Sequence, residues 1–289
     1  MKRTKTIFLF LAAVCINTLE VSAQKTTGKF SLEKAQKLQL ENVLKSVTGM
    51  DMMGQSMEMT ADINMLHNIE VKSKNDTSFF VNSTLTKMKS NASVMGQTMS
   101  FDSEKKEDLE SESGKAMKNL LNVTQEMELD KNAKVINIKK DTAAALPAAG
   151  GMMDMMKNML GGMSDLSNGA SDAFQVLPAG KKAGDKWSDS LIADGVKIYR
   201  DFVLKEINGN DATVSFSGNQ LTNKKVEQQG MEVTVSMDAK LSGESVVDIS
   251  TGIIKQKTLN MDGTGTAEMM GQNIPMTTKV TSTTTVKSK

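Results

Sequence analysis

Apolar and polar residues alternate along most of this chain with a period of two, the pattern of a strand with one buried face. One clear run begins after Gln55, where odd positions are mostly apolar and even positions polar or charged. His67 shares the odd parity and is therefore expected to point inward. A second uninterrupted run extends from Met231 to Leu241. Long strands with one apolar face predict an antiparallel sheet.

The tripeptide Met-Gly-Gln occurs three times between such runs, at residues 53–55, 95–97 and 270–272. A glycine followed by a polar residue suits a type II′ hairpin turn, because glycine takes the positive φ of the first turn position. If each Gly-Gln pair is the turn, apolar residues face each other across all three hairpins. The predicted pairs include Met50 with Met59, Val94 with Met99, and Ala267 with Met276.

Polar clusters predict three further turns, at residues 74–77, 130–132 and 208–211. Between Phe79 and Val94 the apolar parity switches from odd to even. An extra residue in one strand restores the pairing after such a switch, so a β-bulge is expected near Thr86-Lys87.

Two segments depart from the alternation. Residues 104–121 are charged and serine-rich, with apolar residues at helical spacing, and are predicted to form a helix. Residues 150–167 combine glycines with methionines at i, i+3, i+4 and i+7 spacing and predict a short amphipathic helix.

The predicted fold is mainly β with minor α, a long curved antiparallel sheet or incomplete barrel. Two β-meander halves, about residues 24–138 and 174–289, would form a single domain over 24–289. A helical Met-rich insertion at about 140–172 would separate the halves. The repeated hairpins suggest an internal duplication.

Residues 1–23 have a basic start, a short apolar run and a small-residue site at Val21-Ser22-Ala23, which together predict a secretory signal peptide. The one cysteine, Cys15, lies inside it, so the mature chain would contain no disulfide or cysteine-based metal site. The charges are interspersed, without the basic stripe of nucleic-acid-binding proteins. We expect export, with no transmembrane segment and no nucleic-acid partner.

Methionine is unusually frequent, at 24 residues, and its densest cluster is the insertion. Three interpretations stay open for this cluster: core or lid, a flexible apolar ligand surface, and a thioether site for Cu(I). We predict no bound metal and no cofactor. The candidate ligand-binding residues are Met152, Met153, Met156, Met159 and Met163.

No catalytic motif is present, neither a Gly-x-Ser-x-Gly elbow, nor a His-Glu-x-x-His helix, nor a phosphate-binding loop. A Ser-His-Asp triad would require His67, the only histidine, and a buried hydrogen-bonded histidine is the commoner role on an apolar face. Trp187 follows Gly184-Asp185 and predicts a turn leading into a strand with an aromatic anchor.

The Met-Gly-Gln hairpins, the acidic start of the predicted helix and the run Leu177-Pro178 followed by Gly184-Asp185-Lys186-Trp187 resemble a secreted family of unknown function from Gram-negative bacteria. The resemblance covers nearly all of the mature chain. It implies export to the periplasm or cell surface and a largely antiparallel β fold. It implies no activity and no catalytic residues.

The leading hypothesis is an exported, non-enzymatic protein whose concave, Met-lined sheet face binds a lipid or another hydrophobic ligand. The alternative is a structural or protein-interaction module of the cell envelope with a filled core. An enzyme is the third hypothesis.

Overall fold

The structure is a computed structural model that describes residues 24–52, 54–94, 96–111, 114–115, 118, 120–139, 166–193, 195–228, 231–269 and 271–289. The predicted signal peptide and most of the predicted Met-rich helix therefore lie outside the described residues. Within them, no helix is long and apolar enough to cross a membrane.

The described chain consists mainly of strands, with a few short helical segments. The N-terminal strands are β1 (Lys37–Met52), β2 (Gln55–Lys74), β3 (Ser78–Val94), β4 (Gln97–Asp102), β5 (Thr124–Asp130) and β6 (Val135–Lys139). The C-terminal strands are β7 (Lys186–Ala193), β8 (Val196–Asn208), β9 (Asp211–Gln228), β10 (Met231–Asp248), β11 (Ile254–Met269) and β12 (Gln272–Ser288). The helices are α1 (Lys106–Glu110) and the 3₁₀ helix η2 (Leu166–Ala173).

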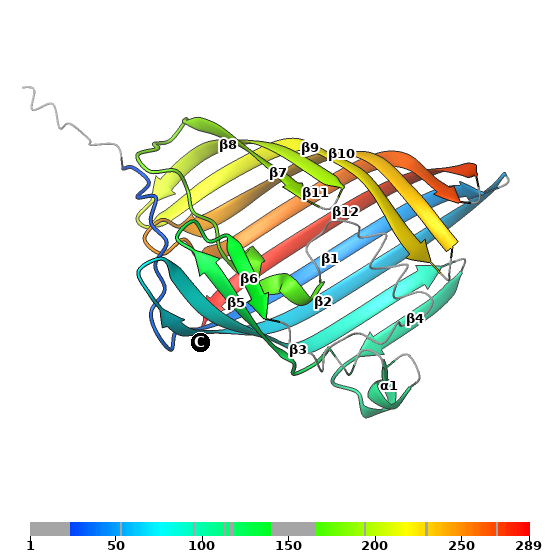
Figure 1. The fold of residues 1–289 in the computed structure, drawn as a ribbon, viewed down its shortest axis with the longest axis horizontal. Coiled ribbons are helices and arrows are strands. Elements are labelled where there is room, and N and C mark those ends of the chain that lie inside the picture. Colours follow the sequence, from blue (N-terminus) through cyan, green and yellow to red (C-terminus); the bar gives the residue numbers. More distant parts are fainter. Residues whose placement is uncertain are drawn as a thin grey trace, which may run out of the picture.

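These strands form a single antiparallel sheet, which confirms the predicted fold class. The strand order is β6-β5-β3-β2-β1-β12-β11-β10-β9-β8-β7, with β4 paired to β3. The first and last strands meet at the centre, where β1 pairs with β12. The sheet curves strongly without closing into a barrel, and β6 and β7 are its edges (Figure 1).

One edge of β3 is shared by two strands. Its first half pairs with β5, from Ser78 to Thr84, and its second half pairs with β4, from Lys89 to Val94. Between them, the backbone amides of Asn122 and Ser103 donate to the carbonyls of Leu85 and Met88. The two ends of the loop that carries α1 therefore hydrogen-bond to β3 at Leu85 and Met88, between the parts of β3 that pair with β5 and β4.

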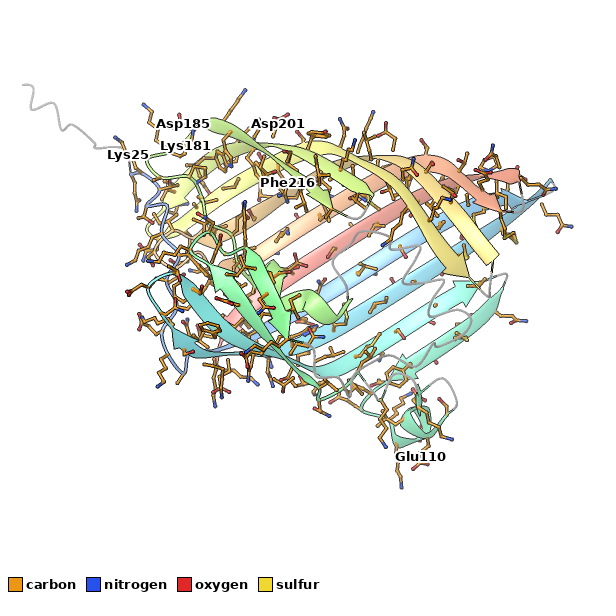
Figure 2. The ribbon with its side chains drawn as sticks, viewed as in Figure 1. Lys25, Glu110, Lys181, Asp185, Asp201 and Phe216 are labelled. Atoms are coloured by element: carbon orange, nitrogen blue, oxygen red, sulfur yellow. The ribbon has the colours of Figure 1, made fainter. Side chains whose placement is uncertain are left out.

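The two faces of the sheet differ in polarity, as the alternation predicts. On β2 the buried positions are odd, and on β12 they are even. The opposite positions of β12 carry threonine and lysine toward solvent. We call the buried, concave side the inner face. In Figure 2, Phe216 lies within the curve of the sheet, whereas Asp201 and Glu110 project from its outside.

The three predicted Met-Gly-Gln turns occur, but their register is shifted. Met52 pairs with Gln55, Val94 with Gln97, and Met269 with Gln272. The glycine therefore lies in the turn, and the glutamine begins the next strand. The glycine φ angles of 79°, 77° and 76° are at the second turn position rather than the first. The predicted pairs were wrong by two residues on one strand.

The predicted bulge is confirmed. Leu66 pairs with Lys87 and His67 with Leu85, so Thr86 is the extra residue. The Thr86 hydroxyl donates to the Leu66 carbonyl at 3.0 Å, which gives this carbonyl a hydrogen-bond partner at the bulge. The predicted turns at residues 74–77, 130–132 and 208–211 also join paired strands.

The predicted helices are only partly found. Within 104–121, α1 spans Lys106–Glu110, and several of the following residues lie outside the described part. The predicted helix at 150–167 is also largely outside it, and Leu166 begins the 3₁₀ helix η2. Residues 24–36 lead directly into β1, which begins at Lys37.

The two ends of the strands are built differently. All three Met-Gly-Gln turns lie at one end, which we call the Met-Gly-Gln end. The opposite, packed end is crossed by residues 24–36 and by the segment after η2. The Phe30 ring contacts the rings of Phe79 and Phe174 edge-on, with centroids 4.8 and 5.4 Å apart. Backbone hydrogen bonds join Thr26 to Lys181 and Ser31 to Thr251. The chain fills this end with its own side chains.

Candidate functional site

Methionines concentrate on the inner face toward the Met-Gly-Gln end. They pack there together with leucine, isoleucine, valine and phenylalanine side chains. Methionine side chains are unbranched and adapt to irregular neighbours. Among the described residues, the buried methionines on this part of the inner face are Met59, Met65, Met88, Met237, Met261 and Met276, whereas Met127 is buried at the packed end.

A row of polar side chains crosses the inner face between the packed end and the Met-bearing strand segments, where Ser46, Thr48, Thr278 and Ser282 are also buried. Its members occupy cross-strand neighbouring positions on β1, β12, β11 and β10. We call this row the polar belt. Its residues are Asn42, Thr284, Lys257 and Ser245.

The polar belt is hydrogen-bonded on both of its sides. The Ser282 hydroxyl donates to the Asn42 amide oxygen at 3.0 Å. The Ser245 hydroxyl donates to the Gln175 amide oxygen at 2.9 Å. The belt therefore connects the central strands to the segment that follows η2.

The charge on the belt is paired. The Lys257 ammonium lies 3.5 Å from the Asp172 carboxylate, and the two side chains are 23% and 26% exposed. Asp172 belongs to η2, which lies against β1, β2, β3, β11 and β12 on the inner face. This ion pair joins η2 to the sheet and leaves the belt without net charge from these two groups.

His67 lies one row away from the belt, toward the packed end. It is 1% exposed, which confirms its predicted inward orientation. Its Nδ1 is 3.4 Å from the Ser83 hydroxyl, while Nε2 has no hydrogen-bond partner in the described part of the chain. Burial lowers the pKa of His67 to about 4, and the negative charge of Asp172 opposes this shift. The imidazole is neutral near pH 7.

The surroundings of His67 do not match a Ser-His-Asp triad, the catalytic arrangement that would have required this histidine. Ser83 and Asp172 do lie near His67, but the serine is at Nδ1 and is only 2% exposed. A triad needs a nucleophile that a substrate can reach, with the base oriented by its third member. His67 and Ser83 form a buried polar contact, and Asp172 acts on His67 only through its charge.

Solvent reaches the inner face near β7 and β8. Leu191 is 53% exposed although it occupies an inward position opposite Ile198. Beside it, the Arg200 guanidinium donates two hydrogen bonds to the Asp189 carboxylate, at 2.9 and 2.7 Å. Trp187 stacks on Phe202 with an interplanar angle of 6°, and therefore packs as an aromatic anchor at this edge.

The residues predicted to bind a ligand, Met152, Met153, Met156, Met159 and Met163, lie outside the described residues. They stay a prediction. The polar belt was missed, although a signal for it exists in the sequence. Asn42 and Lys257 are polar residues at inward positions, and such positions become recognisable once the strand parity is known.

Comparison with solved structures finds a similar fold in one larger chain. The chain resembles a structure titled "Lipid-protein interactions in lipovitellin", with a TM-score of 0.52 and 11% sequence identity. The match covers 89% of this chain but only 25% of that one, so this chain spans about a quarter of its length. At this identity the likeness shows the fold alone.

An outer membrane channel from Pseudomonas putida F1 aligns over 90% of this chain and 98% of its own length, at 8% identity. Its TM-score of 0.26 is too low for the match to support an argument. No curated protein matches the sequence.

The sequence itself matches a protein family over residues 76–254. The matched span runs from the turn before β3 to the first residue of β11. This span exceeds half of the chain, and it includes the Gly184-Asp185-Lys186-Trp187 run that carried the predicted resemblance. The chain belongs to the family of unknown function DUF6263.

Proposed function

We propose that this protein binds a lipid or another apolar ligand on the inner face of its sheet, without chemical conversion. The observation that carries the proposal is the exposure of inward apolar residues. Leu191 is largely exposed and its cross-strand partner Ile198 is half-buried, although both occupy the inner face. Apolar patches left exposed on a protein surface commonly mark interaction or ligand-binding sites.

The composition of the inner face agrees with this role. Its apolar side chains toward the Met-Gly-Gln end include several methionines, which can repack around ligands of varied shape. The lipovitellin structure supplies only an analogy of architecture. Met152 to Met163 would contribute further thioether surface to the same site.

We further propose that the protein is exported and acts in the cell envelope. This rests on the predicted signal peptide of residues 1–23 and the absence of cysteine from the remaining sequence.

The competing function is an interaction module whose core is filled by its own side chains. The aromatic packing of Phe30, Phe79 and Phe174 shows that the packed end is filled in this way. The two functions therefore differ in what occupies the inner face toward the Met-Gly-Gln end.

Fluorescence quenching distinguishes the two, because Trp187 is the only tryptophan. In a Trp187→Phe background, Phe101→Trp places a reporter at a buried position of the inner-face core, and Val47→Trp places one on the outer face. A fatty acid brominated on its chain should quench the reporter at position 101 and leave that at position 47 unchanged. The unbrominated fatty acid should quench neither.

Absence of quenching at both positions in a folded protein would favour the filled core. Equal quenching at both positions would indicate adsorption to the surface and would also contradict the proposal. Near-ultraviolet circular dichroism checks that each variant retains the packing of the parent.

A further inference from the structure

The packed end carries an excess of basic side chains at its surface. Two segments cross this end, residues 24–36 and residues 178–186, and together they contain six lysines but only two acidic residues. Of these lysines only Lys181 is half-buried, and the others are exposed. We call the six the lysine cluster. Its members are Lys25, Lys29, Lys34, Lys181, Lys182 and Lys186.

The fold brings the two segments together although they are far apart in the sequence. The Thr26 amide donates to the Lys181 carbonyl at 2.8 Å, and the Gly180 amide donates to the Thr26 carbonyl at 2.9 Å. The Lys181 amide also donates to the Thr26 hydroxyl at 2.9 Å. Lys25 and Lys181 therefore lie side by side at this end of the molecule, with Asp185 nearby (Figure 2).

The two acidic residues of these segments neutralise little of this charge. The Glu33 carboxylate is ion-paired at 3.0 Å with the Lys74 ammonium, which lies outside the cluster. The Asp185 carboxylate accepts the backbone amide of Lys182 at 3.0 Å. Within the described part of the chain, the cluster members that form no ion pair are Lys25, Lys29, Lys34 and Lys182.

The turns at the packed end are close to balanced in charge. Lys74 and Asp76 share the turn between β2 and β3. The Lys255 ammonium is ion-paired with the Asp211 carboxylate at 2.6 Å. The positive excess of this end therefore comes from the lysine cluster.

The opposite end of the strands has no such excess. Asp51, Glu58 and Glu268 are exposed beside the Met-Gly-Gln turns, and Lys224 and Lys225 lie near the turn between β9 and β10. The charge of the protein is therefore distributed unevenly along the strand axis. A negatively charged surface would attract the packed end and orient the molecule.

We propose that the packed end docks on an anionic phospholipid surface through the lysine cluster. Each lysine held near such a surface strengthens binding by about fivefold, because its charge is attracted by the lipid phosphates. The inference is independent of the proposed function, since the lysine cluster lies at the surface of the packed end and the proposed ligand on the inner face.

The spread of the lysines fits a plane of many phosphates better than one phosphate ion. Lys34 precedes Ala35, whose amide donates to the Val71 carbonyl of β2, whereas Lys25 lies beside Lys181, near β7. In the strand order, β2 and β7 lie on opposite sides of the central pair. The cluster therefore extends across the packed end, and a single phosphate would reach only some of its members.

The two segments also lack the aromatic surface on which nucleic-acid bases stack. Their one aromatic residue is Phe30, and its side chain is buried. A lipid surface needs no such stacking, because the attraction depends on charge alone.

Co-sedimentation with vesicles tests the proposal. One vesicle contains phosphatidylcholine alone, and the other also contains about 30% phosphatidylglycerol, which supplies negative charge. We expect the protein to bind only the second vesicle at low ionic strength. Binding should disappear near 1 M salt, where the screening length falls to about 3 Å.

Two fourfold variants with the same change in net charge locate the contact. The first removes lysines of the cluster: Lys25→Gln, Lys29→Gln, Lys34→Gln and Lys182→Gln. The second removes exposed lysines elsewhere: Lys45→Gln, Lys105→Gln, Lys197→Gln and Lys240→Gln. We expect the first to weaken vesicle binding by at least about tenfold and the second to have a much smaller effect. Both should bind the brominated fatty acid like the parent, and circular dichroism checks their folding.

A fluorescent label reports the orientation. An environment-sensitive dye on Ala183→Cys, in the exposed part of segment 178–186, should change its emission when anionic vesicles are added. The same dye on Gln272→Cys, at the Met-Gly-Gln end, should not change. Equal changes at both positions would contradict docking by the packed end.

Four further results would overturn the proposal: no binding to the anionic vesicle, equal binding to both vesicles, equal losses in the two fourfold variants, or no loss in the first. Release by inorganic phosphate at constant ionic strength would instead assign the cluster to a single phosphate ion. Tighter binding of a single-stranded oligonucleotide, lost in the first variant, would assign it to nucleic acid. Either result would also contradict docking on lipid.

Discussion

At the scale of single residues, position on the inner face decides which side chains have unusual properties. His67 lies on the inner face of β2 and is 1% exposed, whereas the residues at the alternate positions of the strand face outward. Ser83 is beside its Nδ1, and Asp172 is the charged group that acts on it from η2. Removal from water disfavours the charged imidazolium more than Asp172 favours it. The result is a neutral histidine.

The lowered pKa of His67 predicts a loss of stability in mild acid. The unfolded chain binds a proton near pH 6.5, whereas the folded chain binds it only near pH 4. The unfolded state therefore carries more protons in this window, and stability falls as the pH falls from 6.5 toward 4. The shift corresponds to about 3 kcal/mol in the free energy of unfolding. Urea unfolding at several pH values measures it.

His67→Phe is the control for this prediction, because phenylalanine keeps an aromatic ring and cannot titrate. The difference in unfolding free energy between wild type and His67→Phe should change by about 3 kcal/mol between pH 6.5 and pH 4. A constant difference from pH 7 to pH 4 would show that His67 is not responsible.

At the scale of elements, turns and bulges determine how the strands are aligned. The bulge at Thr86 keeps apolar residues on the inner face along the whole of β3, because it compensates the switch of parity. The Met-Gly-Gln turns perform the corresponding task at the strand ends. Each places its glycine at positive φ, a conformation that costs a residue with a Cβ about 1–2 kcal/mol.

Gly271→Ala tests the turn directly. No neighbouring atom lies within 4 Å of a Cβ at this position, so the substitution changes backbone conformational energy rather than packing. We expect a loss of about 1–2 kcal/mol in the free energy of unfolding. Gly271→Asn should lose less, because asparagine tolerates this conformation better. Equal losses for the two variants, or no loss, would contradict the turn geometry.

At the scale of the whole molecule, the sheet is continuous from edge to edge, and its centre is the pairing of β1 with β12. Residues separated by most of the chain are neighbours there, such as Thr48 and Thr278, whose hydroxyls are 3.0 Å apart. The curvature gives all strands a common inner face, and the polar belt exists only because four strands bring their polar residues into one row.

The central place of β12 predicts a position-dependent response to proline. Thr283 pairs with both Val43 and Thr258, so Thr283→Pro would disturb hydrogen bonding to β1 or β11 and introduce a ring between two neighbours. We expect a loss of at least about 3 kcal/mol in stability, or failure to fold. Ser190→Pro, on the edge strand β7, should be tolerated better. Similar losses measured by chemical unfolding would argue against the strand order.

The sequence alone determined the strands, their faces, the turn positions and the bulge, because each depends on local periodicity or on the backbone preference of a few residues. It could not determine the hairpin register. A shift of two residues keeps every side chain on its face, so Met50 opposite Met57 satisfies the pattern as well as Met50 opposite Met59. Tertiary structure decided which strands are neighbours, that β1 meets β12, and that Asn42, Thr284, Lys257 and Ser245 form one polar belt. These contacts join residues far apart in the chain, and no local pattern encodes such pairing.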